Sequence, residues 1–137
     1  MLLEIFDFLR HRARRTRWKP QLALGRRGED LAHRYLRKRG YTVVARNYAL
    51  ATGDAEADII AWQGDKIVFV EVKSRATGEY GPPDRAVSSQ KAHHLRRVAR
   101  EYTRKAEIPL ERVRFDVVSI VFSKPPEIQL LPDAFSI

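Results

Sequence analysis

The sequence contains no cysteine, and no apolar run in it approaches the ~20 residues that a membrane-spanning helix needs. The absence of cysteine excludes disulfide bonds, thiolate zinc sites and cysteine nucleophiles. It agrees with a reducing compartment, so we expect a cytoplasmic protein without a transmembrane segment. Leu2 and Leu9 near the start are interrupted by Glu4 and Asp7, and positive charge follows them rather than precedes them. That order argues against a secretory signal.

Negative charge is also scarce. The chain of 137 residues has 17 Asp and Glu against 26 Lys and Arg, which gives a net charge of +9. An excess of this size indicates a polyanionic partner, with nucleic acid the first candidate and an anionic membrane surface the second. A surface that only keeps the protein soluble is the simpler alternative.

Residues 1–20 differ in composition from the rest of the chain. Six of residues 10–19 are Lys or Arg and none is acidic, and Pro20 separates this run from the first predicted helix. Such an arm suits contact with phosphates, while a solvated terminus and an amphipathic helix on a membrane surface remain open. We therefore divide the chain into a basic N-terminal extension, residues 1–20, and a single domain, residues 21–137.

The sequence of this domain predicts an α/β fold in which helices cover both faces of a central mixed sheet. Along the chain the predicted order is helix, three strands, helix, strand. Hydrophobic periodicity places one helix at 22–39, ended by Gly40, and another from a cap at Asp84 or Ser88 to about Lys105. The predicted strands are residues 41–47, 56–62, 66–74 and 112–122, with a short edge strand at 128–131. The sequence Gln63-Gly64-Asp65 indicates a tight turn that joins the second and third strands in an antiparallel hairpin.

The third strand carries the first sign of a functional site. Its continuous apolar run, Ile67–Val70, is typical of a strand buried on both faces. Glu71 and Lys73 come next, and side chains two residues apart in a strand point to the same face. Across the predicted hairpin, Asp58 comes near the level of Glu71, so the two carboxylates can converge. A salt bridge between Lys73 and an acid at the sheet edge is the alternative interpretation.

Two carboxylates with open coordination positions suit Mg²⁺ or Mn²⁺. An ion there would polarise a scissile phosphate and lower the pKa of a bound water, and Lys73 could position that water. Glu29 shares a helix side with the apolar Ala32 and Leu36, and Lys91 begins the inward stripe of the second helix. Both are therefore expected to point toward the sheet.

The second helix is strongly basic, and a face of one sign favours phosphate contact over simple solubility. Its basic residues are Arg85, Arg96, Arg97, Arg100, Arg104 and Lys105, against the single acid Glu101. Residues 75–84, beginning at Arg75, form a loop rich in Gly and Pro, whose position suits substrate contact. His93 and His94 are adjacent on the helix and cannot face one metal together, which favours surface histidines.

Several short motifs resemble, in order, those of the YraN-like family of bacterial proteins. They are Gly28-Glu29, Gly40-Tyr41, Arg46-Asn47, Glu56-x-Asp58-Ile59-Ile60, Phe69-Val70-Glu71-Val72-Lys73-x-Arg75, Lys91 and Arg114-Phe115-Asp116-Val117. The resemblance implies a restriction-endonuclease-like fold with a PD-(D/E)xK nuclease signature. Asp58 would then be the Asp of that signature, and Glu71 and Lys73 its Glu-x-Lys.

Glu29 resembles the helical acid of archaeal Holliday-junction resolvases, and Lys91 the helix lysine that follows the core motif in such folds. The chain departs from the family where Ala55-Glu56-Ala57-Asp58 stands in place of Gly-Glu-Ile-Asp. The acids are retained, while the turn that Gly allows and the packing under Ile differ.

These observations support three hypotheses. The first is an endonuclease that depends on Mg²⁺ or Mn²⁺ and acts on DNA, including branched or structured DNA. Asp58 and Glu71 would hold the ion, which the Val72 carbonyl could also reach, and Glu29 would assist at a second ion or through a water. Lys91 and the arginines would bind phosphates. The second is a non-catalytic nucleic-acid-binding protein on the same fold. The third is a protein that docks on a membrane or a partner through residues 1–20. Self-association as a homodimer stays open.

Overall fold

The fold is built on one five-stranded sheet. The computed structural model describes residues 19–76 and 87–137, so predictions for residues 1–18 and for Arg85 lie outside it. The described elements are α2 (Lys19–Lys38), β1 (Thr42–Ala49), β2 (Glu56–Gln63), β3 (Lys66–Arg75), α3 (Ser89–Ala106), a short 3-10 helix (Leu110–Arg112), β4 (Val113–Val121) and β5 (Glu127–Phe135).

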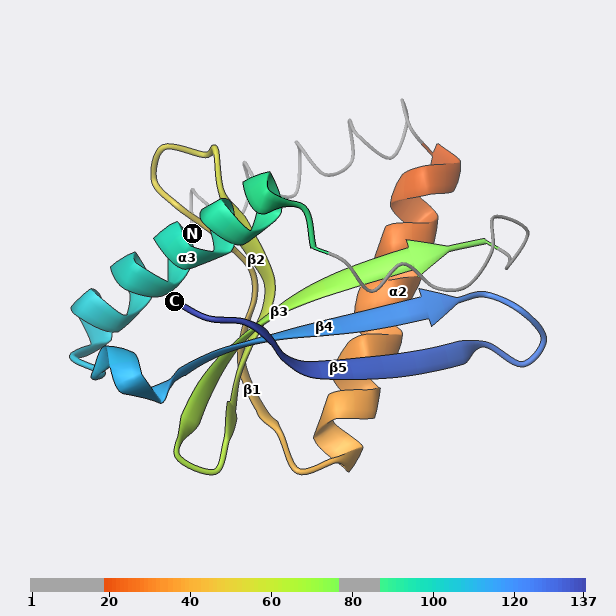
Figure 1. Cartoon of the computed structure of the whole chain (residues 1–137). Coiled ribbons are helices and arrows are strands. Elements are labelled where there is room, and N and C mark those ends of the chain that lie inside the picture. Colours follow the sequence, from red (N-terminus) through yellow and green to blue (C-terminus); the bar gives the residue numbers. More distant parts are fainter. Residues whose placement is uncertain (1–18, 77–86) are drawn as a thin grey trace, which may run out of the picture.

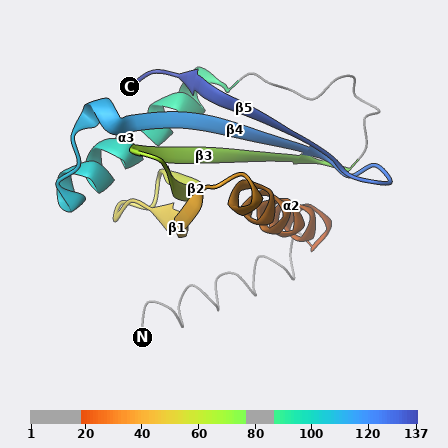
Figure 2. The same cartoon turned by 90° about the horizontal axis from the view of Figure 1, so that it is seen from below.

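The strands lie side by side in the order of the sequence, β1-β2-β3-β4-β5. β3 and β4 are parallel and the other neighbours are antiparallel, so the sheet is mixed. The parallel pair needs a crossover, and α3 lies within it. Figures 1 and 2 show α2 on one face of the sheet and α3 on the other. This confirms the predicted α/β architecture, which is consistent with a restriction-endonuclease-like fold.

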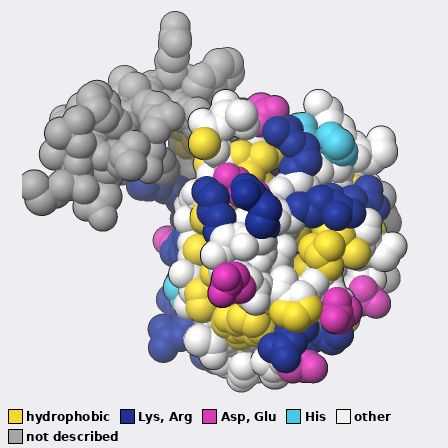
Figure 3. Space-filling view, turned by 90° about the vertical axis from the view of Figure 1, so that its left-hand side faces the viewer, with side chains coloured by type: hydrophobic (Ala, Val, Ile, Leu, Met, Phe, Trp, Pro, Cys, Tyr) yellow, Lys and Arg dark blue, Asp and Glu magenta, His cyan; other side chains and the backbone are white. Residues whose placement is uncertain are grey.

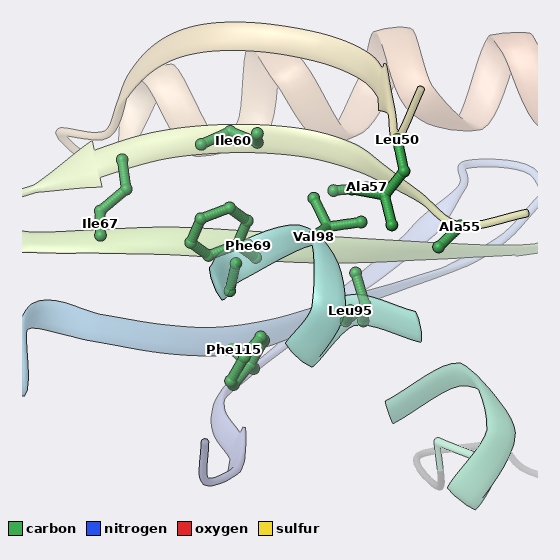
Figure 4. Close-up of a cluster of buried hydrophobic side chains, with 10 residues drawn as sticks. Leu50, Ala55, Ala57, Ile60, Ile67, Phe69, Leu95, Val98 and Phe115 are labelled. Carbon is green, nitrogen blue, oxygen red and sulfur yellow. The ribbon is translucent and has the colours of Figure 1, made fainter. Parts of the chain in front are cut away.

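Each face of the sheet carries its own apolar core, and β3 contributes to both. Ile67 and Phe69 pack toward α3 with Leu95 and Val98, as Figure 4 shows. Val68 and Val70 pack on the other face, in the cluster that includes Ala32 and Leu36 of α2. The prediction that this strand is buried on both faces is confirmed. Glu71 follows this apolar run within β3, where its buried charge needs a partner.

Helix boundaries follow local chemistry, with one correction. The sequence predicts the first helix at residues 22–39, but α2 already begins at Lys19 and includes Pro20 in its first turn. The first turn tolerates proline because its N–H groups have no partner within the helix. Ser88 caps α3, with its side chain accepting the Lys91 N–H. No helix of the described residues is long and apolar enough to cross a membrane.

β5 is longer than predicted, because long-range contacts hold the part beyond Pro132. Its nine residues end at Phe135, which stacks on Phe115 with ring centroids 4.5 Å apart. The fully buried Asp116 accepts the Asp133 N–H at 3.0 Å and the Tyr41 hydroxyl at 2.7 Å. The Arg114 guanidinium also donates to Asp116. Burial and the bond to Asp116 raise the pKa of Tyr41, and the network ties the end of α2 to β4 and β5.

Candidate active site

The central feature of the site is a fork between β2 and β3. These strands pair from the two-residue turn at Gln63↔Lys66 as far as Ile59↔Val70. Beyond that point β2 still pairs with β1, to Glu56, and β3 still pairs with β4, to Arg75. The two strands therefore separate. Asp58 and Glu71 are the first residues past the last pair, one on each side of the fork.

Asp58 bridges the fork. Its Oδ2 atom accepts the Val72 N–H at 2.7 Å, so a side chain supplies the acceptor that the neighbouring backbone would supply in a continuous ladder. Burial raises the pKa of Asp58 well above its ordinary value, and repulsion from Glu71 adds to this. Glu29 and Glu56 contribute further repulsion, while the Val72 N–H acts in the opposite direction. Asp58 thus lies in an environment that disfavours its negative charge.

Glu71 is paired with Lys91 across the α3 face of the sheet. Their Nζ and Oε1 atoms are 3.3 Å apart, and the Glu71 side chain is only 7% exposed. Burial is the largest single influence on the pKa of Lys91 and lowers it, but attraction by Glu71, with help from Asp58 and Glu56, outweighs burial and raises this pKa overall. Lys91 therefore points toward the sheet, as predicted, and forms an ion pair with Glu71.

Glu29 approaches the fork from α2. Burial raises its pKa, while a hydrogen bond from Asn47 and the charge of Arg46 oppose that shift. The guanidinium of Arg46 lies 3.6 Å from Glu29 and 2.8 Å from Asp30. Arg46 and Asn47 both belong to the Arg-Asn motif of β1, so this motif places hydrogen-bond donors and positive charge beside the helical acid.

Gly28 sets how closely α2 approaches β3. A Cβ atom there would overlap the Ser74 Oγ atom, one residue after Lys73. A side chain at position 28 would force Ser74 to move, so Gly28 lets α2 lie close to the strand that carries Glu71 and Lys73. The Gly-Glu motif therefore has a packing role as well as an electrostatic one.

The donor set fits a hydrated hard cation better than a cage of protein ligands. Asp58 and Glu71 repel one another in a partly buried fork, and a divalent cation would neutralise that repulsion. Within residues 19–76 and 87–137, no group of three or more His, Asp and Glu side chains is arranged to hold an ion. Glu29 interacts electrostatically with Asp58 without completing such a group. Mg²⁺ commonly keeps several waters and takes one or two carboxylates.

The structure adds Glu56 and His94 to the residues that the sequence indicated. Both line a pocket of about 260 Å³ together with Lys91 and residues 53–55. Glu56 acts electrostatically on Asp58 and Lys91. Two signals in the sequence could have found them: Glu56 precedes Asp58 by two residues in a strand, and His94 lies about one helical turn after Lys91.

The predicted phosphate-binding residues differ in their surroundings. Arg97 makes a bidentate contact with Asp54, at 2.8 and 3.2 Å, which fixes the β1–β2 loop to α3 and lowers the pKa of Asp54. Arg96 donates to the Ser136 carbonyl at 2.9 Å and lies over the Phe135 ring. Arg100 is exposed, and Lys73 and Arg75 are half-buried at the end of β3. Figure 3 shows Lys and Arg side chains in several groups on one side of the molecule.

Comparisons with known proteins identify the family of this chain. The model of the family described as uncharacterised protein family UPF0102 matches residues 28–120, which include the acids of the fork, Glu29 and Lys91. This chain belongs to the UPF0102 family. The match confirms the family resemblance seen in the sequence motifs.

Other UPF0102 proteins are similar over most of their length. The protein from Solibacter usitatus (strain Ellin6076) is 50% identical over 111 residues, or 81% of this chain and 84% of that protein. The protein from Koribacter versatilis (strain Ellin345) is 45% identical over 83% of this chain and 80% of its own length. The protein from Rhodococcus opacus (strain B4) is 45% identical over 83% and 97%. Their names state no activity, so a function for this chain rests on its site.

Proposed function

We propose that this protein is a divalent-metal-dependent endonuclease that hydrolyses phosphodiester bonds in DNA. The observation that carries the proposal is the fork, where Asp58 and Glu71 lie just beyond the last pair of β2 and β3 and repel one another in a partly buried setting. The raised pKa of Asp58 is typical of an acid at a functional site. The net charge of +9 supports a polyanionic substrate.

We assign a different role in the reaction to each residue of the fork. Asp58 and Glu71, with the Val72 carbonyl, would hold Mg²⁺ or Mn²⁺, which when bound would polarise the scissile phosphate and acidify a water. Lys73 would hold the attacking water in position and stabilise negative charge that develops on the phosphate. Glu29 would orient a further water from the α2 side.

Basic residues around the fork would hold the DNA backbone. Lys91, Arg75 and Arg100 are the described residues to which we assign phosphate contacts, and Arg85 is a further candidate. Arg96 and Arg97 would contribute charge while they also hold the C-terminal segment and the β1–β2 loop. Backbone contacts of this kind carry no base sequence information, so we propose selection by DNA shape, including branched or otherwise structured DNA.

A non-catalytic nucleic-acid-binding protein is the second candidate. The observation that favours it is the exposed, mainly basic surface of α3, formed by Arg100, Arg104 and Lys105. Such a surface would bind phosphates without a metal and in a strongly salt-dependent way. The two candidates differ in whether the acids of the fork matter.

The test is cleavage of a DNA panel that contains duplex, single-stranded, flap and four-way-junction substrates, with Mg²⁺ or Mn²⁺. We expect the wild type to cut at least one substrate, and Glu71→Ala and Lys73→Ala to reduce the rate by about 100-fold or more. Lys66→Ala, at the other end of β3, is the matched control and should retain full activity. If the wild type cuts nothing, or if Glu71→Ala cuts normally, the nuclease proposal is wrong. Metal-independent binding that Glu71→Ala leaves intact would then support the second candidate.

A further inference from the structure

Lys91 lies where several acids of the site attract a cation. Its ammonium lies 3.3 Å from the buried Glu71 carboxylate and is also attracted by Asp58 and Glu56. The N-cap of α3 fixes this placement, because the Ser88 side chain accepts the Lys91 N–H at 3.1 Å in the first turn. The helix therefore begins where its first lysine reaches the acids of the fork.

The pairing has a physical reason. A carboxylate that is 7% exposed is costly without a counter-ion, and in the described structure Lys91 supplies one. A divalent cation held by Asp58 and Glu71 would use the same Glu71 carboxylate. Two cations on one carboxylate repel each other, so the ion and Lys91 compete.

The Lys91 side chain is 57% exposed, so it has room to move away from Glu71. Together with Glu56 and His94, Lys91 also lines the pocket beside the fork. An ammonium that leaves Glu71 would no longer neutralise that carboxylate, and it could contact a phosphate placed at this pocket.

We propose that Lys91 is a built-in counter-ion of Glu71, that a divalent cation displaces it, and that the displaced ammonium then binds a phosphate of the nucleic acid. The inference rests on the proposed function only for the location of the ion and for the nucleic-acid ligand, and it does not require cleavage. It makes Lys91 the residue through which metal binding and nucleic-acid binding strengthen each other. Such coupling is reciprocal.

The first test measures Mn²⁺ binding by titration calorimetry without nucleic acid. We expect Lys91→Met to bind Mn²⁺ about five- to tenfold more tightly than the wild type, at the lower end of typical coupling between sites. Lys91→Arg, which keeps the charge, should resemble the wild type. Lys105→Met is the matched control, because Lys105 is equally exposed on α3 and pairs with Glu101 at 3.0 Å. It should leave Mn²⁺ affinity unchanged.

The second test measures binding of a labelled DNA duplex by fluorescence anisotropy, with and without Ca²⁺, which prefers oxygen ligands as Mg²⁺ does. Ca²⁺ should tighten DNA binding by the wild type and by Lys105→Met, but not by Lys91→Met. If Lys91→Met does not fold, Lys91→Gln removes the same charge with a polar side chain.

Three outcomes would overturn the inference: no Mn²⁺ binding by the wild type, unchanged or weaker Mn²⁺ binding by the Lys91 variants without charge, or the same change in Lys105→Met. Neither measurement depends on bond cleavage. A failure of the nuclease proposal in the cleavage panel can therefore be distinguished from a failure of the counter-ion proposal.

Discussion

At the scale of single residues, two aspartates four positions apart have opposite environments. Asp58 lies in the fork, where burial and the charge of Glu71 raise its pKa. Asp54 is exposed and bonded to Arg97 and Thr52, which lowers its pKa. The same residue type therefore destabilises the metal-free fold at one position and stabilises it at the other, and the two predict opposite pH effects.

We predict that Asp58→Asn, measured with a chelator present, is increasingly more stable than the wild type as the pH rises from about 4 toward the raised pKa of Asp58. The unfolded chain loses the Asp58 proton near an ordinary pKa of about 3.9, while the folded chain retains it to higher pH. The folded state then binds more protons, so the free energy of unfolding of the wild type falls as the pH rises through this window. The amide oxygen of Asn can still accept the Val72 N–H.

Asp54→Asn is the control of opposite sign. The pKa of Asp54 is lower in the folded chain than in the unfolded chain. Its ionised form therefore stabilises the fold at pH values above the unfolded pKa, and this stabilisation is lost as the pH falls through the folded pKa. This variant should therefore be less stable than the wild type at neutral pH and approach it in acid. Urea denaturation across the pH range measures both effects, and parallel profiles for wild type and Asp58→Asn would contradict the environment described for the fork.

At the scale of secondary-structure elements, the hairpin and the helix–strand contact at Gly28 decide where the acids lie. The register could be predicted from the sequence, because the Gly64-Asp65 turn and the alternation of β3 place Asp58 opposite Glu71. The fork itself could not. Whether β2 leaves β3 depends on pairing with β1 and β4, which involves residues distant in the sequence.

Other differences at this scale have the same origin. The predicted edge strand ends at residue 131, but the buried Asp116 and the stacked Phe115 and Phe135 rings hold the chain in the sheet beyond Pro132. The inward orientation of Lys91 can be predicted from helix periodicity. The partner of Lys91 cannot be predicted in this way, because an ion pair between α3 and β3 depends on how the helix packs against the sheet and not on the local sequence pattern.

We predict opposite stability effects for alanine at two glycines of α2. Gly28→Ala would force a Cβ into Ser74 and should cost about 1–3 kcal/mol, as overpacking does in a filled core. In Gly25→Ala the added Cβ meets no atom of the described residues within 4 Å, so this change should stabilise the helix by about 1 kcal/mol. Thermal or urea unfolding measures both changes.

The Gly28 variant also tests whether the contact positions Glu29. Ser74→Gly in the Gly28→Ala background removes the overlapping hydroxyl and Cβ, so it should restore part of the lost stability. If Gly28→Ala were as stable as Gly25→Ala, the close approach of α2 to β3 would not constrain the site.

At the scale of the whole molecule, the excess of positive charge is distributed over both faces of the sheet. α3 presents Arg100, Arg104 and Lys105 to solvent, and α2 presents Arg34, Arg37 and Lys38. Composition predicts a polyanionic partner but not which face it meets. The location of Lys91 beside the fork favours the α3 face.

We predict that the double variant Arg100→Gln/Arg104→Gln binds duplex DNA more weakly and with a smaller salt dependence than the wild type. Each lost phosphate contact should reduce the slope of log K against log salt by about 1. Arg34→Gln/Arg37→Gln removes the same net charge from α2 and is the matched control. Anisotropy titrations at several salt concentrations measure the slopes, and equal effects of the two double variants would show that net charge alone drives binding.

The parallel pairing of β3 with β4 has a consequence for the order of assembly. The hairpin that brings Asp58 and Glu71 together closes over a two-residue turn, so it is the most local part of the site and can form early. Lys91 arrives only when α3 docks, as the chain crosses over to β4. During synthesis from the N-terminus, the two repelling carboxylates therefore meet before their counter-ion does. The fork therefore becomes ordered late, after the second half of the chain has been synthesised and α3 has docked.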